Sequence, residues 1–131
     1  MAGGRGEIRD AVTSPDMASA FTNLVAYRLA GELSDDVGRA VARWDSFEKW
    51  SIGIQLARSA DSIGANIAEA LGRWHTKDRR HLLMVARGSL YETEHWLLRA
   101  DARGLAHGAS RDKFQELART LNGLIKRAPP A

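Results

Sequence analysis

Cysteine is absent from this chain of 131 residues, which excludes disulfides, thiolate metal sites and a cysteine nucleophile. Long uncharged apolar runs are also missing, so no segment resembles a membrane span. The first residues, MAGGRGEIRDAV, carry charges of both signs and lack the apolar stretch of a secretory signal. We therefore expect a cytoplasmic protein without a membrane partner.

Sequence patterns typical of enzymes are missing as well. The four histidines and the serines have no G-x-S-x-G context, and the GRG at 4–6 has no following lysine to make a phosphate loop. Glu92-x-x-His95 and Asp78-x-x-His81 resemble half-sites of a di-iron centre, but they lie roughly 21 Å apart on the solvent side of one predicted helix. The sequence predicts no enzymatic activity, no metal site and no cofactor.

The composition is that of one globular domain. Apolar residues make up 44% and charged residues 27% of the chain, and no segment alternates with a period of two. The fold class is therefore predicted to be all-α. The 19 basic and 16 acidic residues are interspersed, so the net charge of +3 favours an acidic partner only mildly.

Start and stop signals divide the chain into a tail and four helices. Residues 1–13 are glycine-rich and predict a flexible N-terminal tail, and residues 14–128 form the bundle. The helices are expected at about 15–43, 45–74, 76–103 and 110–127. The short connections favour antiparallel neighbours, hence an up-and-down four-helix bundle.

The helix boundaries rest on recognised capping patterns. Ser14-Pro15-Asp16 is typical of a helix start, and Asp45-Ser46-Phe47-Glu48 fits a capping box. Thr76 with Asp78 is expected to begin the third helix, and Gly104 provides a left-handed position after its end. Ser110 is expected to cap the fourth helix.

The apolar faces of the first two helices are broader or more winding than those of the last two. In the first helix a four-residue ladder runs from Phe21 to Val41, and it drifts around the helix. In the second helix the apolar arc spans about 160°. This surplus suggests self-association, unless the first helix crosses its partners obliquely or breaks near Gly31 or Gly38.

Small residues mark the expected close contacts between helices. In the second helix they are Ala57, Ala60, Gly64 and Ala68. In the third helix Gly88 stands at a position where glycine costs roughly 1 kcal/mol relative to alanine. We expect a close approach of neighbouring helices at these positions.

A polar seam lies beside the apolar arc of the second helix. Its members follow a 4-3-4-3-4 spacing, which places them within about 80° of one another: Gln55, Ser59, Ser62, Asn66, Glu69 and Arg73. The seam could fix the register of a subunit interface, or it could form hydrogen bonds within the chain, including a Glu69–Arg73 pair.

Basic residues gather between Gly72 and Tyr91, where the net charge of +4 exceeds that of the whole chain. We expect Lys77, Arg80 and Arg87 to share one water-facing arc, while Arg79 packs its stem on the core side. Together with Arg73, these form a candidate nucleic-acid-binding surface, although most charged helix faces are merely solvated. No RRM, KH or zinc-finger pattern is present.

Several segments resemble one bacterial family. They are Phe21 to Val41, QLARSADSIGANIAE at 55–69, Gly72-Arg73, ARGSLYETE at 86–94 and LNGLIK at 121–126. They are similar to the four helix bundle protein family, also called the 23S rRNA intervening-sequence protein family, which includes the Avd accessory proteins of diversity-generating retroelements. Ala70 departs from the NIAEG pattern of that family.

The resemblance implies an up-and-down bundle and commonly a homopentamer. It also implies a basic surface that engages RNA or DNA, with a reverse transcriptase as a possible protein partner. Two hypotheses follow. The chain is either a homo-oligomeric accessory protein that binds nucleic acid, or a protein-interaction scaffold with no nucleic-acid role.

Overall fold

The computed structural model describes residues 17–73 and 75–128. The helices are α2 (Met17–Val41), α3 (Ser46–Glu48), the π-helix η1 (Lys49–Gly53), α4 (Ile54–Leu71), α5 (Thr76–Ala102) and α6 (Arg111–Arg127). These residues include no strand and no helix long and apolar enough to cross a membrane. The predicted tail at 1–13, the start signal at residues 14–16 and Trp74 lie outside the described residues.

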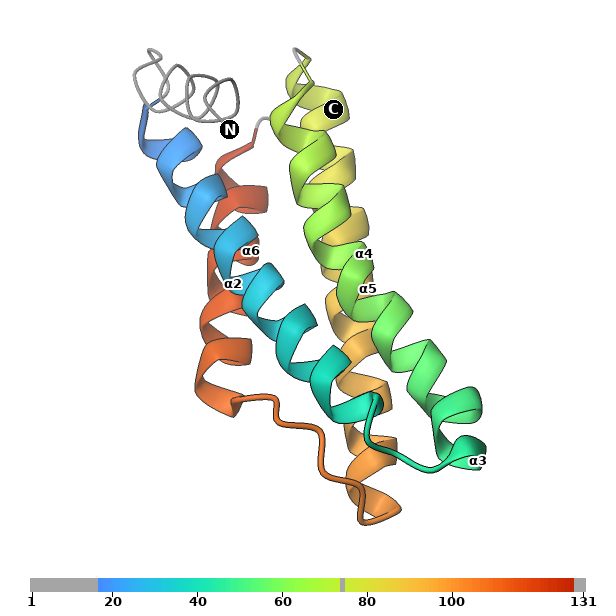
Figure 1. Ribbon diagram of the computed structural model, residues 1–131. Coiled ribbons are helices and arrows are strands. Elements are labelled where there is room, and N and C mark those ends of the chain that lie inside the picture. The colour runs from blue at the N-terminus through green and yellow to red at the C-terminus, as the bar shows by residue number, and fades with distance from the viewer. Residues whose placement is uncertain (1–16, 74, 129–131) are drawn as a thin grey trace, which may run out of the picture.

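The helices form a bundle in which each long helix contacts the next along the chain (Figure 1). Helix α2 packs against α4, α4 against α5, and α5 against α6, while α6 also packs against α2. The turn between α4 and α5 lies at the same end of the bundle as the C-terminal end of α6. The predicted all-α four-helix bundle is therefore confirmed.

Side-chain caps begin two of the helical segments at the predicted residues. Asp45 Oδ1 accepts a hydrogen bond from the Glu48 backbone N–H over 3.1 Å, and Ser110 Oγ accepts one from that of Lys113 over 3.3 Å. The second half of the predicted capping box is wrong. The Glu48 carboxylate pairs with Arg103 at 2.9 Å instead of reaching back to its cap, so it links the α2–α4 turn to the end of α5.

The end of α5 follows the predicted glycine signal. Gly104 has a φ of 69°, a left-handed conformation that glycine adopts without steric strain. This turn lets the Leu105 N–H donate to the Ala100 carbonyl over 2.9 Å, which satisfies one of the last carbonyls of the helix. The chain can then turn away towards α6.

The predicted second helix is not a continuous α-helix. Its first part is α3 followed by η1, and a regular α-helix begins only at Ile54. Gly53 explains part of this arrangement, because a Cβ there would come within 2.9 Å of Val41 Cγ1 and 3.3 Å of Trp44 Cε3. The backbone of η1 thus packs directly against the end of α2 and the residues that follow it.

Helix α2 runs unbroken through Gly31 and Gly38, so the predicted alternative of a break is wrong. Leu29, Leu33 and Val37 of its ladder are all buried inside the bundle. The ladder winds because α2 contacts both α4 and α6. The wide apolar arc of the second predicted helix is likewise buried for the most part, since α4 packs between α2 and α5.

Neighbouring helices of the same chain cover most of the apolar residues on the first two helices, so these residues do not by themselves require self-association, which stays a prediction. The core combines residues from every long helix. Its largest fully buried side chains are Leu56, Ile63, Ile67, Leu83, Leu90, Leu117, Leu121, Val37 and Thr93.

Close helix approach is seen at Gly64 but not at Gly88. A Cβ built at Gly64 would lie 3.7 Å from Ala30 Cβ, an ordinary contact between α4 and α2. At Gly88 nothing lies within 4 Å of such a Cβ, so the prediction of a close approach there is wrong. Gly88 is exposed on the outer side of α5, and no neighbouring helix of this chain requires it.

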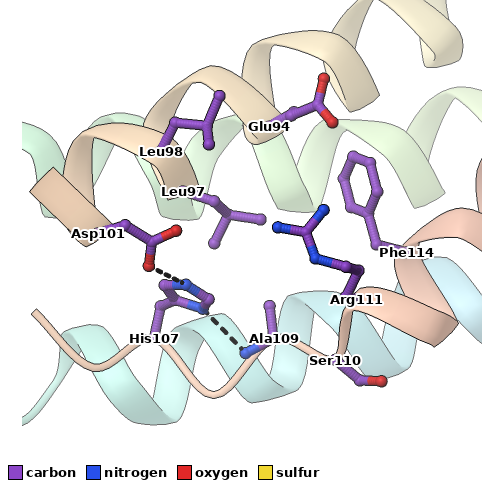
Figure 2. A pocket seen from close by; sticks show the side chains of 9 residues that line it. All are labelled: Glu94, Leu97, Leu98, Asp101, His107, Ala109, Ser110, Arg111 and Phe114. Carbon is purple, nitrogen blue, oxygen red and sulfur yellow. Dashed lines mark hydrogen bonds and ion pairs between the residues drawn. The ribbon is translucent and has the colours of Figure 1, made fainter.

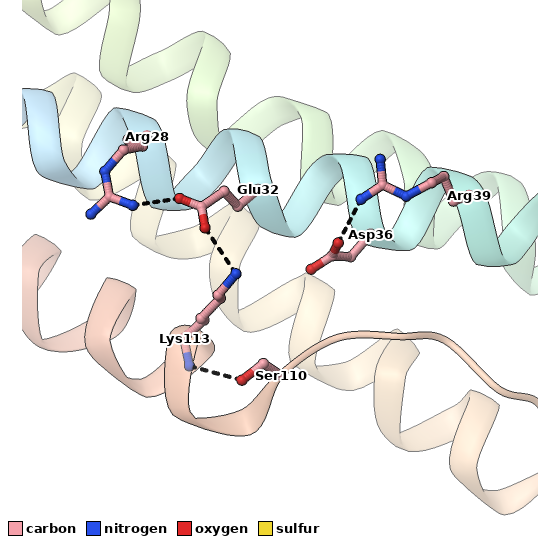
Figure 3. A network of polar contacts seen from close by, with 6 residues as sticks. All are labelled: Arg28, Glu32, Asp36, Arg39, Ser110 and Lys113. Carbon is pink, nitrogen blue, oxygen red and sulfur yellow. Dashed lines mark hydrogen bonds and ion pairs between the residues drawn. The ribbon is translucent and has the colours of Figure 1, made fainter.

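A polar network joins α2 to the start of α6 (Figure 3). The Glu32 carboxylate accepts from Lys113 Nζ at 2.9 Å and from Arg28 at 2.5 Å, and one turn further along α2 Asp36 pairs with Arg39 at 2.7 Å. The hydrogen bond from Lys113 is the main cause that lowers the pKa of Glu32 below its ordinary value. The same bond raises the pKa of Lys113.

Candidate nucleic-acid interface

The turn between α4 and α5 carries the first group of basic side chains. Arg73 is exposed and pairs with Glu69 at 2.6 Å, and the hydrogen bond that Arg73 donates to the Glu69 carboxylate raises the pKa of Arg73. Arg79 turns back towards the same place, where its guanidinium donates to the Arg73 carbonyl through NH2 at 2.8 Å and through Nε at 3.3 Å. Arg79 thus caps the C-terminal end of α4 and fixes the turn.

Lys77 lies at the N-terminal end of α5. It is exposed in the first turn of α5, and its ammonium forms no hydrogen bond or ion pair with a described residue. The N-terminal end of α5 also carries the partial positive charge of the helix dipole. Lys77 and this helix end together present positive charge to solvent.

The helical wheel placed Arg80 and Arg87 on a water-facing arc, but neither side chain is fully exposed. Both side chains are half-buried, because α6 packs alongside this flank of α5. Arg87 NH1 donates to Asn122 Oδ1 over 3.1 Å, so it links α5 to α6. Arg80 Nε is buried and has no hydrogen-bond partner in the described part of the chain.

Helix α6 adds two basic residues that the sequence reasoning missed. Lys126 and Arg127 are exposed in its last turn, at the same end of the bundle as the α4–α5 turn (Figure 1). Basic residues in a last turn are usually explained by the helix dipole. The antiparallel topology already predicted from the sequence was the signal that could have placed them beside Lys77.

We define the basic end of the bundle by the six cationic residues gathered there, Arg73, Lys77, Arg79, Arg80, Lys126 and Arg127. Two acidic residues, Glu69 and Asp78, accompany them among the described residues. The basic end therefore carries four net positive charges, more than the +3 of the whole chain.

The polar seam of α4 faces α5 along its middle section. Ser59 and Thr93 are both buried, and their hydroxyl oxygens lie 3.0 Å apart. Further along, Ser89 donates to Ser62 over 3.1 Å, and Asn66 Nδ2 donates to the Ser62 carbonyl over 2.8 Å. All these hydrogen bonds lie within the chain, and the Ser59–Thr93 and Ser62–Ser89 contacts pair α4 with α5.

The two ends of the seam are open to solvent. Gln55 is exposed near the start of α4, and the Glu69–Arg73 pair is exposed near its end.

Among the described residues, no three His, Asp or Glu side chains are grouped to hold a metal ion. The exposed cations of the basic end can attract anions.

The match to a protein family extends over all the long helices of the bundle. The sequence model of the 23S rRNA-intervening sequence protein family matches residues 22–127, from the second turn of α2 to the end of α6. The chain belongs to the 23S rRNA-intervening sequence protein family. No curated protein matches the chain. The resemblance carried by the motifs of α4 and α5 is thus confirmed.

The chain also has a small pocket between the end of α5 and the start of α6 (Figure 2). His107 Nδ1 accepts the Ala109 N–H over 3.1 Å, which leaves Nε2 to donate to Asp101 over 2.9 Å. Leu97 and Phe114 form its apolar part, with the Arg111 guanidinium between them in the view of Figure 2. These contacts hold the α5–α6 loop in place.

Proposed function

We propose that this protein is a non-enzymatic homo-oligomer that binds nucleic acid through the basic end of its bundle. The observation that carries the proposal is the gathering of cationic residues from α4, α5 and α6 at one end, with exposed Lys77 and Lys126 available to contact phosphates. The family name refers to an intervening sequence of 23S rRNA, which supports a nucleic-acid partner.

The physical basis is electrostatic. Each phosphate neutralised by a lysine or arginine releases counterions, so such binding weakens steeply as salt increases. One basic end offers only a few contacts, but a ring of copies would repeat them and strengthen the field. The homopentamer implied by the resemblance is part of this proposal.

The test is the affinity for a fluorescently labelled RNA hairpin and a DNA duplex, measured by anisotropy across a salt series. We expect the double variant Lys77→Glu/Lys126→Glu to weaken binding at least tenfold at about 50 mM salt. The slope of log K against log salt should fall by about two, one for each lost phosphate contact.

The matched control is Arg43→Glu/Arg119→Glu, which removes the same charge from exposed residues away from the basic end. This control should retain most of the affinity. Absence of binding by the unmodified protein at low salt would refute the proposal. Equal weakening by both double variants would show that net charge, and not the basic end, governs binding.

A second candidate function is that of a protein-interaction scaffold. Phe47 and Trp50, in α3 and η1, are 73% and 70% exposed at the opposite end of the bundle, which is unusual for aromatic residues of a single domain. By resemblance to the Avd branch, a reverse transcriptase is the proposed partner. A pull-down after nuclease treatment should then recover one protein, and Phe47→Ser/Trp50→Ser should abolish that recovery.

A further inference from the structure

The outer side of α5 carries a regular row of exposed residues. Met84, Gly88, Tyr91, His95 and Leu98 follow one another at intervals of 4, 3, 4 and 3 residues, and all are exposed. Met84, Tyr91 and Leu98 remain 40%, 53% and 55% exposed. We call this row the α5 stripe.

The spacing of the α5 stripe is that of a helix-packing seam. Intervals of three and four residues keep side chains on one face of a helix, as at the a and d positions of a coiled coil. The core of this chain uses a different face of α5, which includes Leu83, Leu90 and Leu97. Scattered exposed apolar residues are ordinary, but a row in register along a long helix is typical of a contact surface.

A groove on another side of the bundle has room for large side chains. It runs between α2 and α4 and is lined by small residues that include Gly31, Gly64, Ala65 and Ala68. Side chains as large as those of Tyr91 and Leu98 need such small residues opposite them in order to pack closely.

The charges of the two surfaces are also complementary. The groove carries the acids Asp35, Asp61 and Glu32 against one base, Arg28. Glu32 pairs with both Arg28 and Lys113 of α6, so Asp35 and Asp61 supply the negative charge of the groove. The N-terminal half of the α5 stripe is flanked by basic Lys77, Arg80 and Arg87. Opposite charges of this kind favour association and fix its orientation.

We infer that the α5 stripe of one copy of this chain docks in the α2–α4 groove of a second copy. The inference rests on the homo-oligomeric part of the proposed function. The two surfaces lie on different sides of the chain, so the contact is heterologous and each copy can bind one neighbour on each side. Heterologous contacts form a ring of any number of subunits when the rotation between neighbours closes, and an open filament when it does not.

Nucleic acid is a poorer occupant of the α5 stripe. Glu92, Glu94 and Asp101 flank its C-terminal half, around Tyr91 and Leu98, against one base, Arg99, and the net negative charge would repel phosphates. The basic end remains open in this arrangement, because Lys126 and Arg127 lie on α6 and not beside the stripe's apolar half. The apolar contact made by Tyr91 and Leu98 and the phosphate contacts of Lys126 and Arg127 thus use different residues, while Lys77 and Arg80 lie beside both surfaces.

Two complementary variants test the inference by light scattering after size-exclusion chromatography. Tyr91→Glu/Leu98→Glu disables the stripe but keeps the groove, and Ala65→Trp fills the groove but keeps the stripe. All three residues are exposed in the single chain, so both variants should keep the helical circular dichroism of the unmodified protein. Each variant alone should have a mass of 14.4 kDa.

An equimolar mixture of the two variants decides the matter. The intact groove of the stripe variant can bind the intact stripe of the groove variant, and no other contact of this kind remains. The mixture should therefore give a species of twice the 14.4 kDa chain mass and nothing larger. Phe47→Glu, which removes an exposed aromatic residue elsewhere, should keep the mass of the unmodified assembly.

A stripe variant that assembles like the unmodified protein, or a mixture that stays monomeric, would overturn the inference and leave the proposed function standing. An unmodified protein that is itself monomeric would overturn both the inference and the homo-oligomeric part of the proposed function. Nucleic-acid binding by the basic end is tested separately by anisotropy.

Discussion

Thr93 Oγ1 lies 3.0 Å from Ser59 Oγ in the buried contact between α4 and α5. Thr93 Oγ1 is also 2.7 Å from the Ser89 carbonyl oxygen, and Ser59 donates to the Leu56 carbonyl over 3.1 Å. Each hydroxyl therefore has a second partner on its own helix. The pair joins two helices by a polar contact inside an apolar core, which sets how α4 and α5 are aligned.

A double-mutant cycle measures this contact. We expect Ser59→Ala and Thr93→Val each to lower the free energy of unfolding by about 1 kcal/mol, the usual net value of a buried hydrogen bond. The loss of unfolding free energy in the double variant should be about 0.5–1 kcal/mol smaller than the sum of the two single losses, because the second change leaves no unpaired group. Urea unfolding measures all four proteins, and strictly additive effects would show that the hydroxyls are not coupled.

Two glycine substitutions should have opposite effects on stability. In Gly53→Ala the new methyl group would clash with Val41 and with the Glu48 carbonyl, so we expect a loss of about 1–3 kcal/mol. In Gly38→Ala nothing lies within 4 Å of the added carbon on an exposed helix face, so we expect a gain of about 0.5–1 kcal/mol. Thermal unfolding compares the two, and a neutral Gly53→Ala would contradict the tight packing of η1.

The ion pairs of Glu32 predict a specific dependence of stability on pH. Its pKa is lower in the folded than in the unfolded chain, so its contribution is present above the unfolded value of 4.5 and is lost as pH falls through the folded value. Glu32→Gln should therefore destabilise the protein at about pH 7 and have little effect at about pH 3. Asp35→Asn, which changes an exposed acid on the same helix, is the control.

Salt provides an independent check on the Glu32 network. All its members are partly exposed, so 1 M salt should reduce the difference between the unmodified protein and Glu32→Gln at neutral pH. If the stability difference between the two proteins is equal at acid and neutral pH, or insensitive to salt, the substitution acts through packing and not through charge.

Helix boundaries and core residues could be predicted because their signals are local. Ser110 and Asp45 accept the hydrogen bonds expected of caps, and Gly104 adopts the left-handed conformation expected after a helix. The four-residue spacing of the ladder that ends at Val41 identified buried positions for the same reason. These patterns depend on residues within one or two turns of a helix.

The features that escaped prediction depend on contacts between distant segments. The π-helix η1 follows from the packing of Gly53 against Val41 and Trp44, which no local pattern reveals. Arg87 appeared solvent-facing on a helical wheel, yet Asn122 of α6 accepts its hydrogen bond.

The candidate interface was predicted only in part for the same reason. The basic residues of α5 stood out as one run, but Lys126 of α6 joins them only through the tertiary fold. The apolar faces of α2 and α4 suggested an excess of apolar residues, because the sequence pattern of one helix does not show how many neighbouring helices cover it. The exposed apolar residues lie instead mainly on α5 and at the α2–α4 turn.

Light scattering of the unmodified, purified protein tests most directly whether the bundle works as an assembly that repeats its basic end. We predict a single species whose mass is a multiple of 14.4 kDa, with five copies favoured. A species of 14.4 kDa that persists at all micromolar concentrations would contradict the assembly.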